Sequence, residues 1–179
     1  MRYIVLLGPK HSGKTSAGKA LAALLSCGFI DLDDSIAQSS GKSPRALFIE
    51  GPEIFRKAEA EALTAIFQSG ISGAAGSVSP VIASGGGLSD NPDALTVLAN
   101  NTAAVTVFLD VSAKTAWERI SGAGELPPFL KTENPEETHR SLHERRNAAY
   151  RQLASLVIRV DDKSPQEIAQ EILNGLHHN

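Results

Sequence analysis

The chain is 179 residues long, which is the size of one domain and enough to bury a core without disulfides or a structural metal. Its hydrophobic share of 42% and charged share of 21% are ordinary, and the net charge of −3 argues against general binding of nucleic acid or anionic membranes. No apolar run approaches the about 18 residues of a membrane helix, and the single cysteine, Cys27, excludes an internal disulfide. We therefore expect one cytoplasmic domain over residues 1–179, acting as a monomer.

The first motif lies between a predicted strand and a predicted helix. The apolar run 3–7 predicts a buried parallel strand, and helical periodicity follows over residues 14–25. Between them, Gly8-Pro9-Lys10-His11-Ser12-Gly13-Lys14-Thr15 fits the phosphate-loop pattern, whose main-chain N–H groups converge on phosphate oxygens. Lys14 would reach the outer phosphates, and Thr15 would hold Mg²⁺ through its hydroxyl. The alternative is a glycine-rich turn that happens to end in Lys-Thr, and the flanking strand and helix argue against it.

A second and a third strand are predicted next in the chain. Residues 29–31 read as a strand, and the acidic residues Asp33 and Asp34 stand where a helix can begin. Ser43-Pro44 is typical of a helix cap followed by a first-turn proline, and helical spacing runs over 52–67. The Gly- and Ser-rich residues 69–80 predict a surface loop. The strand at 81–83 ends abruptly at a triple glycine, and a helix near 92–99 follows.

The second half of the chain continues the same alternation. Strands are expected at 104–109 and 156–160, and helices at 112–120, 136–153 and 165–176, whereas residues 121–135 lack periodicity and predict a loop. Strands that alternate with helices imply a parallel sheet covered on both faces. We therefore predict a three-layer α/β fold with a five-stranded parallel sheet, which binds its ligands beyond the carboxyl ends of the strands.

A series of motifs, in order along nearly the whole chain, resembles the shikimate kinases. After the phosphate loop come Phe29-Ile30-Asp31-Leu32-Asp33, Phe55-Arg56-Lys57-Ala58-Glu59, Gly85-Gly86-Gly87, Arg146 four residues before Tyr150, and a loop at 161–165. Their order and spacing are far more specific than any one of them. The resemblance implies a P-loop, mononucleotide-kinase-like fold. It also implies transfer of the γ-phosphoryl group of ATP, with Mg²⁺, to the 3-hydroxyl of shikimate.

The resemblance also implies roles for individual residues. Nucleotide binding falls to Gly8, Lys10, His11, Ser12, Gly13, Lys14, Thr15, Ser16, Arg119 and Pro165, the last two beside adenine. Substrate binding falls to Asp33, Arg56, Gly85, Gly86, Gly87 and Arg146. Lys14 and Asp33 are the catalytic candidates, and Thr15 and Asp31 are the candidate Mg²⁺ ligands. The residue chemistry agrees, because two arginines can clamp a carboxylate and Asp33 can orient a hydroxyl and accept its proton.

Each acceptor-site residue also has a plainer interpretation. Asp33 can cap a helix, Arg56 can be a surface cation, Arg146 can belong to a solvated helix face, and the triple glycine can be a flexible turn. His139 and His143, four residues apart on a predicted helix, have the spacing of a metal-binding face. No third ligand is evident in the sequence, so we expect them on a solvated helix face.

The predicted lid, residues 121–135, departs from the family pattern. Shikimate kinases usually carry an arginine before Pro-Leu-Leu in the lid, and Pro127 takes its place in the stretch 125–130. Lys131 and Lys10 are the two candidates for the missing positive charge. Two alternatives to an active shikimate kinase therefore stay open. One is a nucleotide- or shikimate-binding relative with little catalysis, and the other is a kinase of another small polyol acid.

Overall fold

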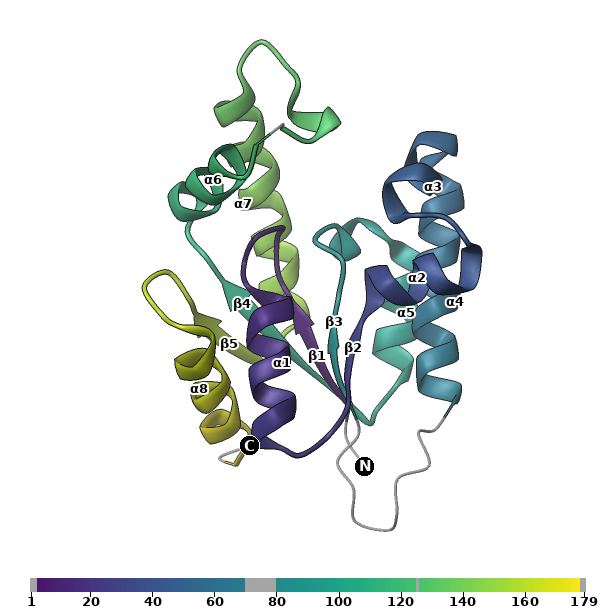
Figure 1. The fold of residues 1–179 in the computed structure, drawn as a ribbon, viewed down its shortest axis with the longest axis vertical. Coiled ribbons are helices and arrows are strands. Elements are labelled where there is room, and N and C mark those ends of the chain that lie inside the picture. Colours follow the sequence, from purple (N-terminus) through teal and green to yellow (C-terminus); the bar gives the residue numbers. More distant parts are fainter. Residues whose placement is uncertain (1–2, 70–79, 125, 178–179) are drawn as a thin grey trace.

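The computed structural model describes residues 3–69, 80–124 and 126–177 (Figure 1). Its centre is one parallel sheet of five strands in the order β2-β3-β1-β4-β5. The strands are β1 (Tyr3–Leu7), β2 (Phe29–Asp31), β3 (Val81–Ala83), β4 (Ala104–Asp110) and β5 (Leu156–Arg159). The predicted sheet is therefore confirmed, and the strand ends differ from the prediction by at most one residue.

Helices cover both faces of the sheet, which confirms the three-layer α/β prediction (Figure 1). They are α1 (Lys14–Leu24), α2 (Leu32–Ser40), α3 (Pro44–Glu50), α4 (Pro52–Gln68), α5 (Pro92–Asn100), α6 (Ala113–Gly122), α7 (Pro135–Leu153) and α8 (Pro165–His177), with 3₁₀ turns η1 (Leu88–Asp90) and η2 (Pro128–Leu130). Along β1, Leu6 packs in the cluster of α1 and α8, whereas Val5 and Leu7 pack in that of α4, α5 and α7. Because both faces of β1 are buried, its sequence is a continuous apolar run.

Side-chain caps set where several helices begin. The Ser43 hydroxyl accepts a hydrogen bond from the Ala46 N–H, with Pro44 in the first turn of α3. The side chain of Asp31 caps α2 by accepting from the Asp33 N–H. Since Asp31 takes the capping role that the sequence left open for Asp33, the Asp33 carboxylate stays in the first turn of α2, available to a ligand.

The α6–α7 region differs from the sequence prediction in two ways. Helix α6 runs to Gly122, and the turn η2 lies inside the stretch predicted as a plain loop. His139 and His143 are 5% and 4% exposed, so the prediction of a solvated face was wrong. The Trp117 ring packs on His139 at 5.5 Å between centroids, and His143 Nε2 lies 2.9 Å from the Val111 carbonyl oxygen. The described part of the chain holds no group of three potential metal ligands.

The sheet order places the carboxyl ends of three strands side by side. β1 is central and pairs with β3, which in turn pairs with β2, so the turns that follow these three strands meet at one edge. This is the edge at which open α/β sheets bind ligands. Most of the predicted loop at 69–80, namely residues 70–79, lies outside the described residues. Within the described ranges, every helix is too short or too polar to span a bilayer.

Candidate active site

The phosphate loop joins β1 to α1 and requires its two glycines. Gly8 has a φ of 148°, and a Cβ on it would stand 2.8 Å from Ser12 Oγ and 2.9 Å from the Leu109 carbonyl oxygen. Gly13, directly before α1, has a φ of 90°. A side chain at Gly8 has no room, and one at Gly13 would occupy a left-handed conformation that costs about 1 kcal/mol or more.

His11 adopts the left-handed conformation without being a glycine, with a φ of 62°. Such a residue is held by its surroundings. Here Arg119 Nη1 donates to the His11 carbonyl oxygen at 3.0 Å, from across the site. Partial burial lowers the pKa of His11, and the positive charges of Lys10, Lys14 and Arg119 lower it further. The loop is therefore lined by positive charge, which suits an anionic ligand.

Lys14 is buried at the base of this loop. Its Nζ donates to the carbonyl oxygens of Gly8 and Pro9, both at 2.8 Å, and to Ser12 Oγ at 3.4 Å. Burial lowers the pKa of Lys14 to about 8, although the nearby carboxylates of Asp33 and Asp31 act in the opposite direction. The ammonium is thus enclosed by the loop that would receive phosphates and is stabilised by two acids at its edge.

Thr15 and Asp31, the predicted Mg²⁺ ligands, are brought together. The Thr15 hydroxyl donates to Asp31 Oδ2 at 2.9 Å, and Asp31 Oδ1 accepts from the Asp33 N–H at 3.1 Å. A hydroxyl beside a carboxylate is the hard oxygen donor set that Mg²⁺ takes, with waters and substrate phosphates filling its other positions. The residues present therefore fit Mg²⁺.

The triple glycine separates the phosphate loop from a group of acids. A Cβ on Gly86 would stand 2.7 Å from the Lys10 main-chain nitrogen, so the two turns touch here. A Cβ on Gly85 would stand 2.9 Å from Glu59 Oε1 and 3.2 Å from Asp33 Oδ1. Close packing therefore favours glycine at these two positions, most strongly at Gly86, where the neighbour is main chain.

Asp33 and Glu59 are the two acids beside Gly85. Asp33 keeps solvent contact, yet partial burial and the charge of Asp31 raise its pKa, with Lys14 acting against them. Glu59 on α4 is 1% exposed, and burial raises its pKa to about 7. Its Oε1 has no hydrogen-bond partner among the described residues. A protonated Glu59 can donate toward this turn, while an ionised Asp33 can accept from a hydroxyl.

Asn91 supports Glu59 and was missed by the sequence analysis. Its amide nitrogen donates to Glu59 Oε2 and to the Arg56 carbonyl oxygen, both at 2.8 Å. Its own Oδ1 caps α5 by accepting from the Ala94 N–H at 3.2 Å. An Asn before Pro92 signals a cap, but nothing in the sequence signals the contact to α4. Glu59 is the last residue of the Phe55–Glu59 motif, and its place in that motif was the one sequence feature that could have marked it as a site residue.

The two predicted clamp arginines lie on different helices. Arg56 on α4 pairs with Glu53 Oε1 at 2.8 Å, an exposed partner that a ligand can replace at little cost. Arg146 on α7 is 18% exposed and pairs with Asp90 Oδ2 at 2.7 Å, and its Nη1 donates to the Gly86 carbonyl oxygen at 3.2 Å. Arg146 therefore lies against the triple glycine and not on a solvated helix face.

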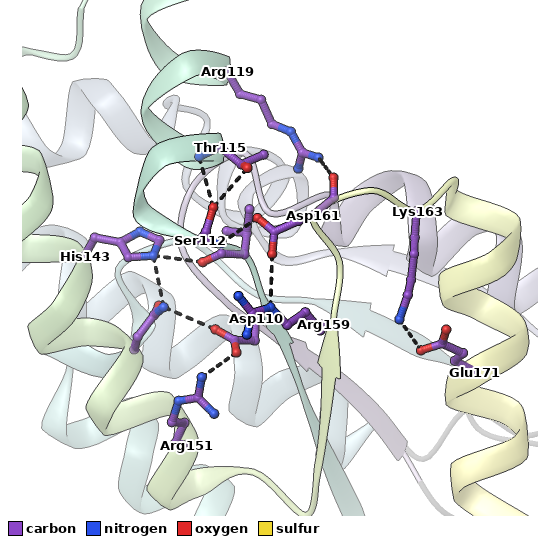
Figure 2. Close-up of polar contacts among 12 residues, drawn as sticks. Asp110, Ser112, Thr115, Arg119, His143, Arg151, Arg159, Asp161, Lys163 and Glu171 are labelled. Atoms are coloured by element: carbon purple, nitrogen blue, oxygen red, sulfur yellow. Dashed lines mark hydrogen bonds and ion pairs between the residues drawn. The ribbon is translucent and has the colours of Figure 1, made fainter.

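Arg119 connects the phosphate loop to the loop that precedes α8, which begins at Pro165 (Figure 2). Besides its bond to His11, it donates from Nη2 to the Asp161 carbonyl oxygen at 3.3 Å. The Asp161 carboxylate accepts from the Ser112 N–H at 2.9 Å. Burial would raise the pKa of Asp161, but hydrogen bonds from Ser112, Thr115 and Arg159 hold this pKa at about 2. The structure thus brings Arg119 next to the 161–165 loop, with Pro165 at the start of α8 and Ser16 in the first turn of α1.

The lid residues lie between α6 and α7. The Pro127 carbonyl oxygen accepts from the Leu130 N–H at 2.9 Å, Leu130 is fully buried, and Phe129 is 45% exposed. Lys131 is exposed on this segment. Lys10 belongs to the phosphate loop itself. Its positive charge weakly opposes the rise in the pKa of Asp33, which burial and the charge of Asp31 cause.

Comparisons with known proteins agree with this geometry. A family model described as shikimate kinase matches residues 10–177. Shikimate kinases from Sulfurihydrogenibium sp. and Marinomonas sp. are 34% and 32% identical, the first over 98% of both chains and the second over 97% of this chain and 91% of the relative. The Acinetobacter baumannii shikimate kinase in complex with shikimate superposes with a TM-score of 0.84 at 28% identity, covering 100% of this chain and 94% of that one. The Aquifex aeolicus shikimate kinase has a TM-score of 0.77 at 29% identity, covering 99% and 97%. This chain therefore belongs to the shikimate kinase family.

Proposed function

We propose that the protein transfers the γ-phosphoryl group of ATP to the 3-hydroxyl of shikimate, giving shikimate 3-phosphate. The observation that carries the proposal is the contact of the Lys10 main chain with Gly86. It joins a phosphate loop to a turn flanked by Asp33, Glu59 and Arg146, so a phosphoryl donor and a polyol acid can lie side by side. The single cysteine supports the cytoplasm as the place of action.

In the nucleotide half, the loop N–H groups and Lys14 would bind the phosphates, and Arg119 with the 161–165 loop would border the base. Thr15 and Asp31 would hold Mg²⁺, which when bound neutralises charge on the phosphate oxygens. The present hydrogen bonds of Lys14 go to loop carbonyls. Exchanging them for phosphate oxygens gives the ammonium anionic partners, and this raises its pKa again.

In the acceptor half, Arg56 and Arg146 would bind the shikimate carboxylate, and Asp33 would orient the 3-hydroxyl and accept its proton. The proton passes from the hydroxyl oxygen to an Asp33 carboxylate oxygen as the new O–P bond forms, while the bond between the γ-phosphorus and the β–γ bridging oxygen breaks and ADP leaves. A raised pKa makes Asp33 a better acceptor of that proton than an ordinary surface carboxylate. The glycine turn lets the main chain approach the ring.

One observation favours the second candidate, a binding protein with little catalysis. Pro127 supplies neither charge nor donor where the family usually has arginine.

We propose that Lys10 supplies the missing positive charge, with Lys131 as the competing candidate. The case for Lys10 is its place in the phosphate loop, whose main chain meets the glycine turn at Gly86, and the small effect of its charge on the pKa of Asp33.

A coupled ADP-release assay with and without shikimate tests the proposal, with product identification by phosphorus NMR. We expect shikimate-dependent ADP release that is lost in Lys14→Ala. Shikimate binding by calorimetry without turnover would support the second candidate, and ADP release that shikimate does not stimulate would contradict the proposal. Quinate in the same assay tests the alternative of a different polyol acid.

A further inference from the structure

Asp90 is a side chain next to the acceptor site to which neither the motifs nor the proposed function gives a role. It closes the turn η1, three residues after Gly87, and its N–H donates to the Gly87 carbonyl oxygen at 2.9 Å. Its carboxylate accepts from both neighbouring arginines of α7. Arg145 Nη1 donates to Oδ1 at 2.8 Å, and Arg146 donates to Oδ2 from Nε at 2.9 Å and from Nη2 at 2.7 Å.

The contact leaves part of the Arg146 guanidinium open. An arginine has five N–H donors, of which Asp90 takes those on the Nε side and the Gly86 carbonyl oxygen takes one on Nη1. One N–H on each terminal nitrogen remains. A Cβ on Gly87 would lie 3.2 Å from Nη2 and 4.0 Å from Nη1, so the guanidinium stands directly over the glycine turn.

The group formed by Asp90, Arg145 and Arg146 keeps a positive net charge, so it can still attract an anion. Arg145 and Arg146 carry two positive charges, Asp90 carries one negative charge, and the group keeps a net +1. Burial would raise the pKa of Asp90, but the hydrogen bonds from Arg145 and Arg146 hold it below its ordinary value, so the acid is ionised at neutral pH. The pair of Asp90 and Arg146 is largely buried, at 19% and 18% exposure, whereas Arg145 is 62% exposed.

We infer that Asp90 is a positioning residue, which holds Arg146 over the glycine turn with two donors free for the carboxylate of the acceptor. The inference rests on the proposed function. A flexible arginine must lose its side-chain freedom on binding, and a fixed one has already lost it, so a fixed clamp binds more tightly and selects more strongly for a carboxylate. Arg145 acts on Asp90 from the opposite side and keeps its carboxylate from rotating.

The test compares Asp90→Asn with Asp93→Asn, a matched exposed acid three residues further on. For Asp90→Asn we expect KM for shikimate to rise about tenfold, with KM for ATP unchanged, because one clamp is misplaced and the phosphate loop is not. The preference for shikimate over its methyl ester, which lacks the charge, should shrink. Asp93→Asn should behave as wild type. A lower KM in Asp90→Asn would mean that Asp90 competes with the substrate, and an unchanged KM and ester ratio would mean that it does nothing for binding; either overturns the inference.

A double-mutant cycle separates positioning from general support of the fold. If Asp90 acts through Arg146, Asp90→Asn should add almost nothing to the KM already raised by Arg146→Ala. Fully additive effects would contradict the inference. Its failure is distinguishable from failure of the proposed function, which would show as wild-type protein that neither binds nor phosphorylates shikimate.

Discussion

At the scale of single residues, the acceptor site holds a buried acid whose pKa is raised to about 7 by burial. Asn91 donates to Glu59 and so favours its ionised form, whereas the nearby Asp33 carboxylate further disfavours ionisation, and burial outweighs both effects. When Glu59 is protonated, Asp33 is the one charged acid of this pair beside Gly85, and the hydroxyl-accepting and donating roles then fall to separate side chains.

This arrangement predicts a pH dependence of stability. Folding raises the pKa of Glu59 from 4.5 to about 7, so its stabilising contribution is complete below pH 4.5 and is lost as the pH rises through about 7. The full difference is on the order of 3 kcal/mol. Denaturant unfolding measures the free energy of unfolding at pH values from 4.5 to 8. Between these values this free energy should decrease less in Glu59→Gln than in wild type. Glu61→Gln, an exposed acid on the same helix, is the control and should show the same decrease as wild type. Identical pH profiles for wild type and Glu59→Gln would contradict the prediction.

At the scale of elements, periodicity in the sequence predicted the strands and helices. It could not predict the side-chain contacts between elements, which depend on tertiary packing. The strands β1 and β3 could be predicted because every residue in them is buried and their runs are continuously apolar. The edge strands β2 and β5 are only partly buried, and their runs are short. The caps at Ser43 and Asn91 are local, so the starts of α3 and α5 could be located from sequence. His139 and His143 were misassigned because α7 is polar nearly all round, and contacts from other parts of the chain bury them: Trp117 of α6 packs on His139, and the Val111 carbonyl meets His143. Asn91 meets Glu59, and Asp90 meets Arg146, across elements that lie far apart in the chain, which no local pattern encodes.

The lid supplies the prediction at this scale. Pro127 has a fixed φ and no N–H, so it cannot stabilise charge on the transferring phosphoryl group. Losing one such donor typically costs about 10²–10³ in rate. We expect Lys10→Ala to lower kcat by about 10²-fold, and Pro127→Arg to raise the kcat of wild type and restore part of that loss in Lys10→Ala. The coupled assay compares Lys10→Ala, Pro127→Arg and the double variant with wild type.

Two further variants make that prediction decisive. Lys131→Ala should leave kcat nearly unchanged, and so should Lys114→Ala, a control cation that is 86% exposed on α6. A loss of kcat in Lys131→Ala with wild-type kinetics in Lys10→Ala would assign the charge to the lid instead. Turnover insensitive to both lysines would remove each of them from the mechanism.

At the scale of the whole molecule, the sheet order makes one site from two half-sites. β1 leads into the phosphate loop and β3 leads into the glycine turn, and the two strands are hydrogen-bonded neighbours although they lie more than seventy residues apart. The β2 acids join from the far side of β3. The donor and the acceptor therefore approach each other across a single strand spacing, and the Lys10–Gly86 contact sets how closely they can meet.

The variant Gly86→Ala tests the contact between the phosphate loop and the glycine turn. No left-handed φ is involved at Gly86, so the new methyl group acts only by its size, with its carbon 2.7 Å from the Lys10 nitrogen. One of the two turns must move, at a cost of about 1–3 kcal/mol in stability. Because the shift separates donor from acceptor, we expect kcat to fall by about tenfold or more, with a smaller effect on the binding of ATP alone. Gly122→Ala is the matched control, since a Cβ there meets nothing within 4 Å and should leave turnover unchanged. Wild-type kcat in a Gly86→Ala protein that shows the expected loss of stability would mean that the spacing of the two turns does not limit phosphoryl transfer.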